Sequence, residues 1–431
     1  MRIRKLQLKN IGTFDAAEFE FKPQAEGKAE VHILTGPNGS GKTTILYALA
    51  SVFDNLQNQN SESNRPSNYF AKRFWHFKNL PDNLYQSELI ASFDEGETVK
   101  VFGQENGRLS YTTNNSIIDI YKHSIVNIPS QFEFEFAVLA YSGYRYVRSS
   151  KIISIQESTE NPLFTSLEFF KQPGFTINQW IANNISKQAI AEKKHLASQR
   201  YADVIEILQK TISDVIGAEV SFELNLSPLD LVVKINNAEL DFDVLPDGVR
   251  SLIGWIGDLL MRLDQLKWKD DVPVNEHALI LLLDEIEIHL HPAWQRKVLP
   301  AVQKLFPNAQ IFLTTHSPFV VNSVDGAAVY ELKVKDGKAY LGEVSESKSS
   351  ASYRSVLREV FDIEKPFGGE TQDELDKFQQ QRDQLLKGET VAEKQFIQRA
   401  RKLAKQSEEL LSIVSLEIKQ INKIKGTNYE L

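Results

Sequence analysis

Residues 31–49 read VHILTGPNGSGKTTILYAL and combine an apolar strand, a glycine-rich turn and a helix that begins at a lysine. The turn fits the pattern G-x-x-x-x-G-K-[ST] and stands in the strand–turn–helix setting that this pattern requires. Glycines allow backbone N–H groups to surround phosphate oxygens, and the helix N-terminus adds positive potential. The alternative, an ordinary glycine-rich turn, does not account for the matching strand and helix.

The stretch therefore predicts an α/β fold with a phosphate-binding loop. We expect Lys42 to reach the β and γ phosphates of ATP and the Thr43 hydroxyl to bind Mg²⁺. The residues predicted to bind the nucleotide are Gly36, Pro37, Asn38, Gly39, Ser40, Gly41, Lys42, Thr43 and Thr44.

A second segment, HALILLLDE at residues 277–285, supplies the strand that such a loop requires as a partner. Its apolar run is typical of a buried parallel strand, and Asp284 at its end is predicted to organise Mg²⁺ together with Thr43. Glu285 then stands where a carboxylate can orient and deprotonate the attacking water.

Glu285, Glu287, His289 and His291 alternate directly after Asp284 and would share one face of an extended chain. Such a pattern could bind zinc. However, the run follows a Mg²⁺ site, a helix is predicted to start after it, and no third histidine lies nearby. A strand-to-helix turn held by imidazole hydrogen bonds is therefore the favoured interpretation.

A third strand is predicted at AQIFLTTHSP, residues 309–318, and it ends near His316. Ligands collect at the carboxyl ends of the strands of an open α/β sheet. His316 is accordingly a candidate for contact with the γ-phosphate.

Composition limits the class of protein. With 42% hydrophobic and 25% charged residues, the 431-residue chain resembles a soluble globular protein, and no apolar run approaches the roughly 20 residues of a membrane helix. The N-terminus lacks the pattern of a signal peptide, so we expect a cytoplasmic protein without a membrane partner. There is no cysteine, which excludes disulfides and thiolate chemistry. A net charge of −8 gives no global attraction to nucleic acid, although it does not exclude a local basic face that binds nucleic acid.

The order of the phosphate loop, LPDGVRS (residues 245–251), LLLDE and TTHSP resembles the ATP-binding-cassette (ABC) class of ATPases. Over roughly residues 1–335 the resemblance is to the non-transporter branch with SMC, RecF-like and OLD proteins. It implies an α/β ABC-type ATPase head with a mixed β-sheet, a helical lateral insertion and a helical C-terminal extension.

In that class ATP and Mg²⁺ lie between two subunits, so the resemblance implies a homodimer or higher homo-oligomer. Asp247 and Gly248, in the signature segment, would donate N–H groups to the partner's γ-phosphate. The usual signature serine is replaced by Pro246, which has neither hydroxyl nor N–H. An ordinary helix start is the alternative for this segment, and the two interpretations are compatible.

A turn at Tyr141, Gly143 and Arg145 also approximates a turn that lies near the nucleotide in this branch. The alternative is that Arg145 is an ordinary surface arginine.

The distance in sequence between Lys42 and Asp284 requires an insertion in the ATPase. The predicted regions are an N-terminal ATPase lobe (1–150), a helical and strand-containing insertion (151–240), a C-terminal ATPase lobe (241–345) and a helical C-terminal region (346–431). In the last region a heptad-like stripe predicts either a docking face for a partner or a helix folded back on its own domain. Its residues are Phe396, Leu403, Leu410, Val414 and Ile421.

Segments 245–263, 284–300 and 314–318 look similar to Septu-type and retron-associated ATPases. This resemblance implies a sensor or regulator of an antiphage complex that acts with a separate HNH-type nuclease. A RecF- or SMC-like DNA repair or recombination ATPase is the alternative, and an ATP-gated scaffold with slow turnover is another. A self-contained OLD-type nuclease would require a Toprim domain, for which the C-terminal region is too short.

Overall fold

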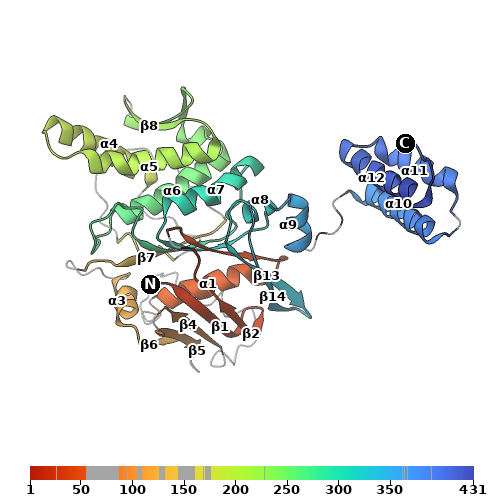
Figure 1. Cartoon of the computed structure of the whole chain (residues 1–431). Helices are drawn as coiled ribbons and strands as arrows, with labels where there is room; N and C mark the ends of the chain where they lie inside the picture. Colours follow the sequence, from red (N-terminus) through yellow and green to blue (C-terminus); the bar gives the residue numbers. More distant parts are fainter. Residues whose placement is uncertain are drawn as a thin grey trace. The chain divides into compact units, whose positions relative to one another are not determined.

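The computed structural model describes residues 1–431 except 26, 55–86, 95, 104–108, 126–131, 144–160, 168, 170–175, 228, 362, 364, 366 and 390. It contains two compact units, Met1–Val356 and Leu357–Leu431. Sheets and covering helices form the first unit, and helices form the second (Figure 1). No helix in the described part of the chain is long and apolar enough to cross a membrane.

A mixed sheet of six strands carries the phosphate loop. In spatial order the strands are β14 (Lys338–Glu346), β13 (Ala328–Lys335), β3 (Glu30–Thr35), β12 (Ala309–Thr314), β11 (Ala278–Leu283) and β7 (Phe136–Tyr141). The pair β13–β14 is antiparallel, and the other neighbouring pairs are parallel. The central strands are buried apolar runs, as expected for a parallel sheet covered on both faces.

The carboxyl ends of these parallel strands lie in register. Leu283 pairs with both Tyr141 and Leu313, and Thr314 pairs with Leu34. The segments that follow β3, β7, β11 and β12 therefore meet at one edge of the sheet, as the sequence predicted for the phosphate loop, the acidic pair and His316.

Helix α1 (Lys42–Phe53) lies between this sheet and a second, antiparallel sheet, and it contacts strands of both (Figure 1). The strand order of the second sheet is β2 (Phe14–Glu20), β1 (Ile3–Ile11), β4 (Glu88–Phe93), β5 (Thr98–Gly103) and β6 (Leu109–Thr113). Helix α3 (Ser116–Ser124) contacts α1 and β6. Burial alternates along β4 and β5, which matches the alternating sequence of these strands.

Helices cover the other face of the six-stranded sheet (Figure 1). Helix α5 (Gln199–Ile216) contacts α4 (Ile177–Lys193), α6 (Asp247–Asp264) and α7 (Pro292–Leu305). A small antiparallel sheet of β10 (Ala238–Asp241), β9 (Leu229–Ile235) and β8 (Val220–Leu226) follows α5 in the chain, and the short turn of 3₁₀ helix η3 (Phe242–Val244) leads into α6. Residues 177–216, within the predicted insertion, thus form two helices joined by residues 194–198.

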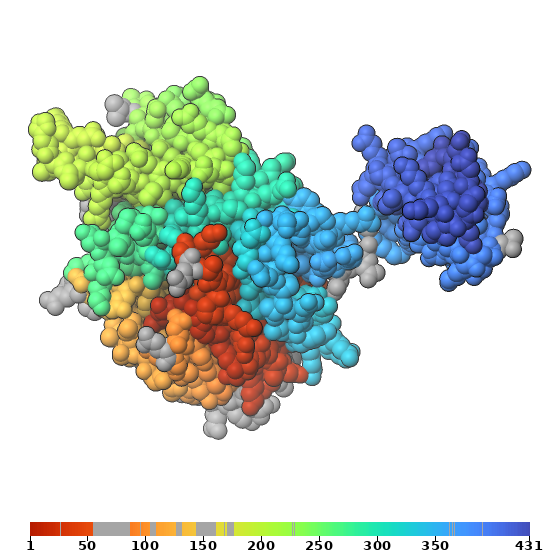
Figure 2. All heavy atoms as spheres, in the orientation of Figure 1, coloured from red at the N-terminus to blue at the C-terminus, as the bar shows by residue number. Residues whose placement is uncertain are grey.

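A hairpin turn at Asp336 and Gly337 connects β13 to β14. Both turn residues have positive φ values, 52° and 73°, as a tight two-residue hairpin turn requires. The Ala339 N–H donates to the Thr13 carbonyl at 2.9 Å, which ties this hairpin to the turn between β1 and β2. Figure 2 shows the N-terminal strands (red) beside this late part of the chain (blue). Two short helices, α8 (Pro318–Val321) and α9 (Tyr353–Glu359), flank the hairpin in sequence.

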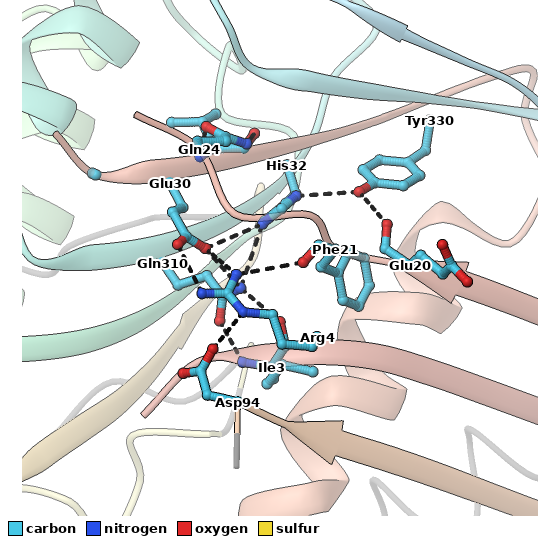
Figure 3. Close-up of polar contacts among 12 residues, drawn as sticks. Ile3, Arg4, Glu20, Phe21, Gln24, Glu30, His32, Asp94, Gln310 and Tyr330 are labelled. Carbon is cyan, nitrogen blue, oxygen red and sulfur yellow. Dashed lines mark hydrogen bonds and ion pairs between the residues drawn. The ribbon is translucent and has the colours of Figure 1, made fainter. Parts of the chain in front are cut away.

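A buried polar network joins β1 to the starts of β3 and β12 (Figure 3). Arg4 donates through both terminal nitrogens to the Glu30 carboxylate, at 2.7 and 3.0 Å. Gln310 exchanges two hydrogen bonds with the backbone of Ile3, at 2.8 and 2.9 Å, and lies 3.4 Å from the buried His32 ring. Burial by itself raises the pKa of Glu30, but the contacts with His32 and Arg4 outweigh it and lower the pKa to about 2.

We expect Glu30→Gln to lower the free energy of unfolding of the first unit by about 2 to 3 kcal/mol at pH 7. The pKa of Glu30 is about 2 in the folded protein and near 4.5 in the unfolded chain. Its contribution is therefore present above about pH 4.5 and is lost as the pH falls toward 2. Urea unfolding followed by tryptophan fluorescence measures this difference, since all five tryptophans lie before residue 357.

Glu18→Gln is the matched control for this substitution. Glu18 pairs with Lys5 at 2.7 Å on an exposed surface, where solvent screens the interaction, so this variant should unfold like the wild type. A loss of stability in Glu30→Gln that is as large at pH 3 as at pH 7 would contradict the assignment of a low pKa.

The second unit is a bundle of α10 (Gly369–Lys387), α11 (Glu393–Ala404) and α12 (Glu408–Lys425). Phe378 and Phe396 stack in its interior with ring centroids 5.0 Å apart. Its core consists of Leu375, Phe378, Phe396, Ala400, Leu403, Leu410, Val414, Ile418 and Ile421.

The stripe from Phe396 to Ile421 is therefore not an exposed docking face, and that expectation was wrong. Its five residues are at most 2% exposed, because they fill the core of their own bundle. They also belong to two helices, since the chain turns between Ala404 and Glu408. The alternative, helices that pack within their own domain, is confirmed. Periodicity alone could not decide, because it reports only that apolar residues share a face.

Candidate nucleotide site

The phosphate loop is a tight turn from β3 into α1. Gly36 and Gly41 have φ values of 138° and 85°. A Cβ atom at Gly36 would lie 2.3 Å from the Leu332 carbonyl oxygen, and one at Gly41 would lie 2.5 Å from the Phe14 ring. Both positions require glycine, for conformation and for space. At Gly39, in contrast, a Cβ would meet no atom within 4 Å, so the middle of the loop faces open space.

Lys42 folds back over this loop. Its Nζ donates to the carbonyl oxygens of Gly36 and Pro37, at 2.9 and 3.0 Å. Burial lowers the pKa of Lys42, while the charges of Asp284 and Glu285 oppose that shift. The ammonium group is thereby held at the loop, where a phosphate would need a point charge.

The rest of the loop supplies further donors. Ser40 is buried, and its Oγ has no hydrogen-bond partner among the residues that the structure describes. Pro37, Asn38 and Gly39 form the exposed crest of the loop. A partnerless buried hydroxyl, a lysine and a glycine-rich backbone at a helix N-terminus fit the phosphates of a nucleotide such as ATP.

Asp284 lies between the ends of α1 and β12. The Thr43 Oγ1 is 3.0 Å from both oxygens of its carboxylate, and the Thr314 Oγ1 donates to Oδ1 at 2.6 Å. The structure thus brings together the two predicted magnesium ligands, which are 241 positions apart in the sequence. A hydroxyl beside a carboxylate is a donor set that fits Mg²⁺.

Glu285 has a backbone φ of 49°, which is uncommon for a residue with a side chain. Its N–H donates to the Thr314 Oγ1 at 2.8 Å. Burial raises the pKa of Glu285, and the charges of Asp284 and Glu287 act in the same direction. A carboxylate with a raised pKa is a stronger proton acceptor, which suits activation of water.

His316 follows β12 and is exposed at the edge of the site. Its backbone N–H donates to the Glu287 Oε1 at 2.6 Å. Although much of the residue is exposed, partial burial of the ring and the charge of Lys42 lower the pKa of His316, whereas Glu285 and Asp284 oppose this. The lowered pKa favours the neutral form of the ring, which lies near the charged groups of Lys42, Glu285 and Asp284.

Asp247 and Gly248 begin α6, directly after Pro246, so the predicted helix start is confirmed. A Cβ at Gly248 would lie 2.7 Å from the carbonyl oxygen of His289 and 2.9 Å from the Trp294 ring. Asp247 is exposed and bonded to Arg250 at 2.9 Å. In the described part of the chain, no hydrogen bond joins either signature residue to the loop at residues 36–44.

The segment after the acidic pair is a strand-to-helix turn. His291 caps α7, because its Nδ1 accepts from the Ala293 N–H at 3.3 Å, and Pro292 is the first residue of that helix. His289 has a positive φ of 64°. Within the described ranges, no group of three histidine, cysteine or acidic residues is placed to hold a metal ion, so the zinc alternative gains no support.

The predicted turn at Tyr141 is described only as far as Gly143, and Arg145 lies outside the described residues. The Tyr141 hydroxyl donates to the Asp258 Oδ2 at 2.8 Å. A Cβ at Gly143 would lie 2.9 Å from the Glu285 Oε2, so this glycine makes room for that side chain.

Two parts of the site had no role in the sequence prediction. Thr314 contacts both members of the acidic pair, and its only signal was a hydroxyl placed two residues before His316. The turn between β1 and β2 packs on the phosphate loop: a Cβ at Gly12 would lie 2.7 Å from the Thr44 side chain, and Phe14 lies against Gly41. Nothing local in the sequence reports that contact, because it joins separate strands.

The chain is similar to several known proteins. A family model described as "AAA domain, putative AbiEii toxin, Type IV TA system" matches residues 31–322. The chain is 23% identical to the Septu protein PtuA of Bacillus thuringiensis over 77% of the chain and 74% of that protein. It is 25% identical to the Retron Vc95 probable ATPase of Vibrio cholerae serotype O1 biovar El Tor, over 74% of this chain and 72% of that protein. Similarity to the Retron Ec83 probable ATPase of Escherichia coli, at 28% identity, covers 50% of the chain and 39% of that protein.

Among solved structures, the crystal structure of the SmcHead bound to the C-winged helix domain of ScpA is similar, with a TM-score of 0.50. The match covers 80% of this chain and 98% of that one at 14% identity. At that identity the likeness shows the fold alone. The predicted α/β head of ABC type, with its mixed sheet, is thereby confirmed.

Proposed function

Because the chain belongs to the family described as "AAA domain, putative AbiEii toxin, Type IV TA system", we propose that it is an ABC-type ATPase that hydrolyses ATP between two subunits. The observation that carries this proposal is the meeting of Lys42, Thr43, Asp284 and Glu285 at one edge of the sheet. The names of the two retron relatives support ATPase activity at the level of the family.

The roles of the residues follow from their positions. The loop backbone and Lys42 would hold the phosphates, and Thr43 with Asp284 would hold Mg²⁺. Bound Mg²⁺ supplies neutralisation of the phosphate charge. Glu285, set by its backbone hydrogen bond to Thr314, would orient water and accept its proton, and His316 would contact the γ-phosphate.

Two subunits are required because the signature segment serves another chain. Asp247 is exposed at the start of α6, and among the described residues no hydrogen bond links it to the loop of its own chain. The N–H at the exposed Asp247 would be the first of α6 to meet the γ-phosphate held by a partner, whereas Gly248 is buried beside His289 and Trp294. Pro246 adds no donor there, so the backbone after it carries this contact.

We further propose that the ATPase is the sensor or regulator of an antiphage complex and that a separate nuclease subunit delivers its output. The similarity to Septu and retron proteins supports this role.

Purified wild-type chain tests the ATPase proposal. With MgATP it should release phosphate and shift from monomer toward dimer in light scattering, and it should leave DNA uncut. Lys42→Ala prepared in parallel reports any contaminating activity. A monomer in saturating MgATP would contradict the two-subunit site, and DNA cleavage by the wild type but not by Lys42→Ala would contradict a separate nuclease.

The role in defence needs the native locus. Tagged chain expressed from that locus should retain a nuclease in a pull-down and should reduce phage plating, and Lys42→Ala should plate phage like an empty vector. Protection by the chain alone, without any copurifying protein, would contradict the proposed complex.

A further inference from the structure

A buried network of hydrogen bonds connects helix α6 to strand β7. The Tyr141 hydroxyl donates to the Asp258 Oδ2 at 2.8 Å, and the Arg262 Nε donates to the same oxygen at 2.7 Å. Asp258 and Arg262 lie one turn apart on α6 and are only 6% and 3% exposed. Buried charges of this kind hold a definite geometry, because neither group can exchange its partner for water.

Arg262 also links this network to residues 162–165. It donates to the Pro162 carbonyl oxygen, and its Nη2 donates to the Thr165 Oγ1 at 3.0 Å. The Tyr141 ring meets α6 a second time, with its centroid 6.1 Å from that of Trp255. Tyr141 is thus held by two successive turns of α6.

The other end of Tyr141 reaches the acidic pair. Its carbonyl oxygen accepts from the Asp284 N–H at 2.8 Å. Two residues later, the backbone at Gly143 lies against the Glu285 carboxylate, within 2.9 Å of where a Cβ would stand. Residues 141–143 therefore touch the backbone of Asp284 and the side chain of Glu285.

Helix α6 links these contacts to the signature segment. Asp247 and Gly248 form its first turn, and Asp258 lies about 16 Å further along the same helix. Nearly every residue between them is buried, so a displacement at one end of the helix would be transmitted along its length.

We propose that Tyr141 is a positioning residue that couples engagement of the signature segment to the placement of Glu285. The inference rests on the proposed function, because only a dimer brings the partner's γ-phosphate to Asp247 and Gly248. A displacement of α6 on that engagement is passed through Asp258 to Tyr141, and through residues 141–143 to the Glu285 carboxylate. Each subunit then hydrolyses its own ATP when its signature segment also binds the γ-phosphate of the ATP held by its partner.

Tyr141→Phe tests this coupling, since it removes one hydroxyl and keeps the ring against Trp255. We expect unchanged equilibrium ATP binding and unchanged ATP-dependent dimerisation, with kcat lower by about tenfold and KM within about twofold. The dependence of the rate on ATP should be less sigmoidal in the variant than in the wild type, because only the cooperativity that comes from ATP-dependent dimerisation remains.

Tyr121→Phe is the matched control. Its hydroxyl is also buried and accepts from the Val138 N–H of β7 at 2.9 Å, but in the described part of the chain it makes no hydrogen bond to α6. This variant should lose thermal stability as Tyr141→Phe does and keep wild-type kcat and cooperativity.

Three results separate the possible failures. A Tyr141→Phe variant with wild-type kcat and cooperativity would overturn the coupling and leave the ATPase dimer intact. An equal loss of kcat in Tyr121→Phe would also overturn it, since any loosening of β7 would then suffice. A wild-type chain that neither dimerises nor hydrolyses ATP would reject the proposed function, and the coupling with it.

Discussion

Lys42→Ala should raise the dissociation constant for ATP by about 100-fold or more, to the point where binding is lost at physiological concentrations. The substitution removes the point charge that Nζ holds over the loop and leaves a cradle of neutral N–H groups. Stability should hardly change, because the freed carbonyl of Pro37 lies at an exposed position and can bind water. Isothermal titration with ATP and with ATP plus Mg²⁺ measures the effect.

The control for this variant is Lys9→Ala, which removes an exposed lysine from β1 of the same unit. It should bind ATP like the wild type, with the same thermal midpoint. Unchanged ATP affinity in Lys42→Ala would remove the phosphate-loop assignment altogether.

Glu285→Gln should retain ATP and slow its hydrolysis by about 10² or more. Glutamine preserves the shape of the side chain and the backbone hydrogen bond to Thr314, and Asp284 keeps its two hydroxyl partners. What is lost is the proton acceptor. Single-turnover phosphate release, compared with the ATP affinity of the same preparation, separates the chemical step from binding.

Glu276→Gln, at an exposed position just before β11, controls for the loss of a negative charge near this strand. It should turn over normally. Normal turnover in Glu285→Gln itself would instead assign the role of base to His316 or another group.

The sequence predicted those parts of the site that depend on local pattern. Gly36 and Asp284 stand directly after recognisable buried strands, Lys42 and His316 follow such strands within a few residues, and parallel pairing brings the ends of these strands together. The fold class followed from the same strands and from the order of the motifs.

Other features depend on contacts that no local pattern records. The link from Tyr141 to Asp258 joins residues 117 positions apart, and Thr314 acquires its role only when β12 pairs with β11. The heptad-like stripe of the C-terminal unit was correctly seen as an apolar face. Its covering surface could not be inferred, because the same spacing suits a partner helix and a neighbouring helix of the same bundle.

The strand order of the central sheet has a consequence for folding of the protein during its synthesis. Strand β3, which bears the phosphate loop, is flanked by β13 and β12, so both of its neighbours are translated roughly 280 residues after it. At about 5 to 20 residues per second, a ribosome leaves this apolar strand unpaired for roughly 15 to 60 seconds. Nascent chains must be shielded from aggregation during that interval, and fragments that end before β12 cannot assemble the ATP site. Nucleotide binding can therefore begin only once nearly all of the first unit has been made.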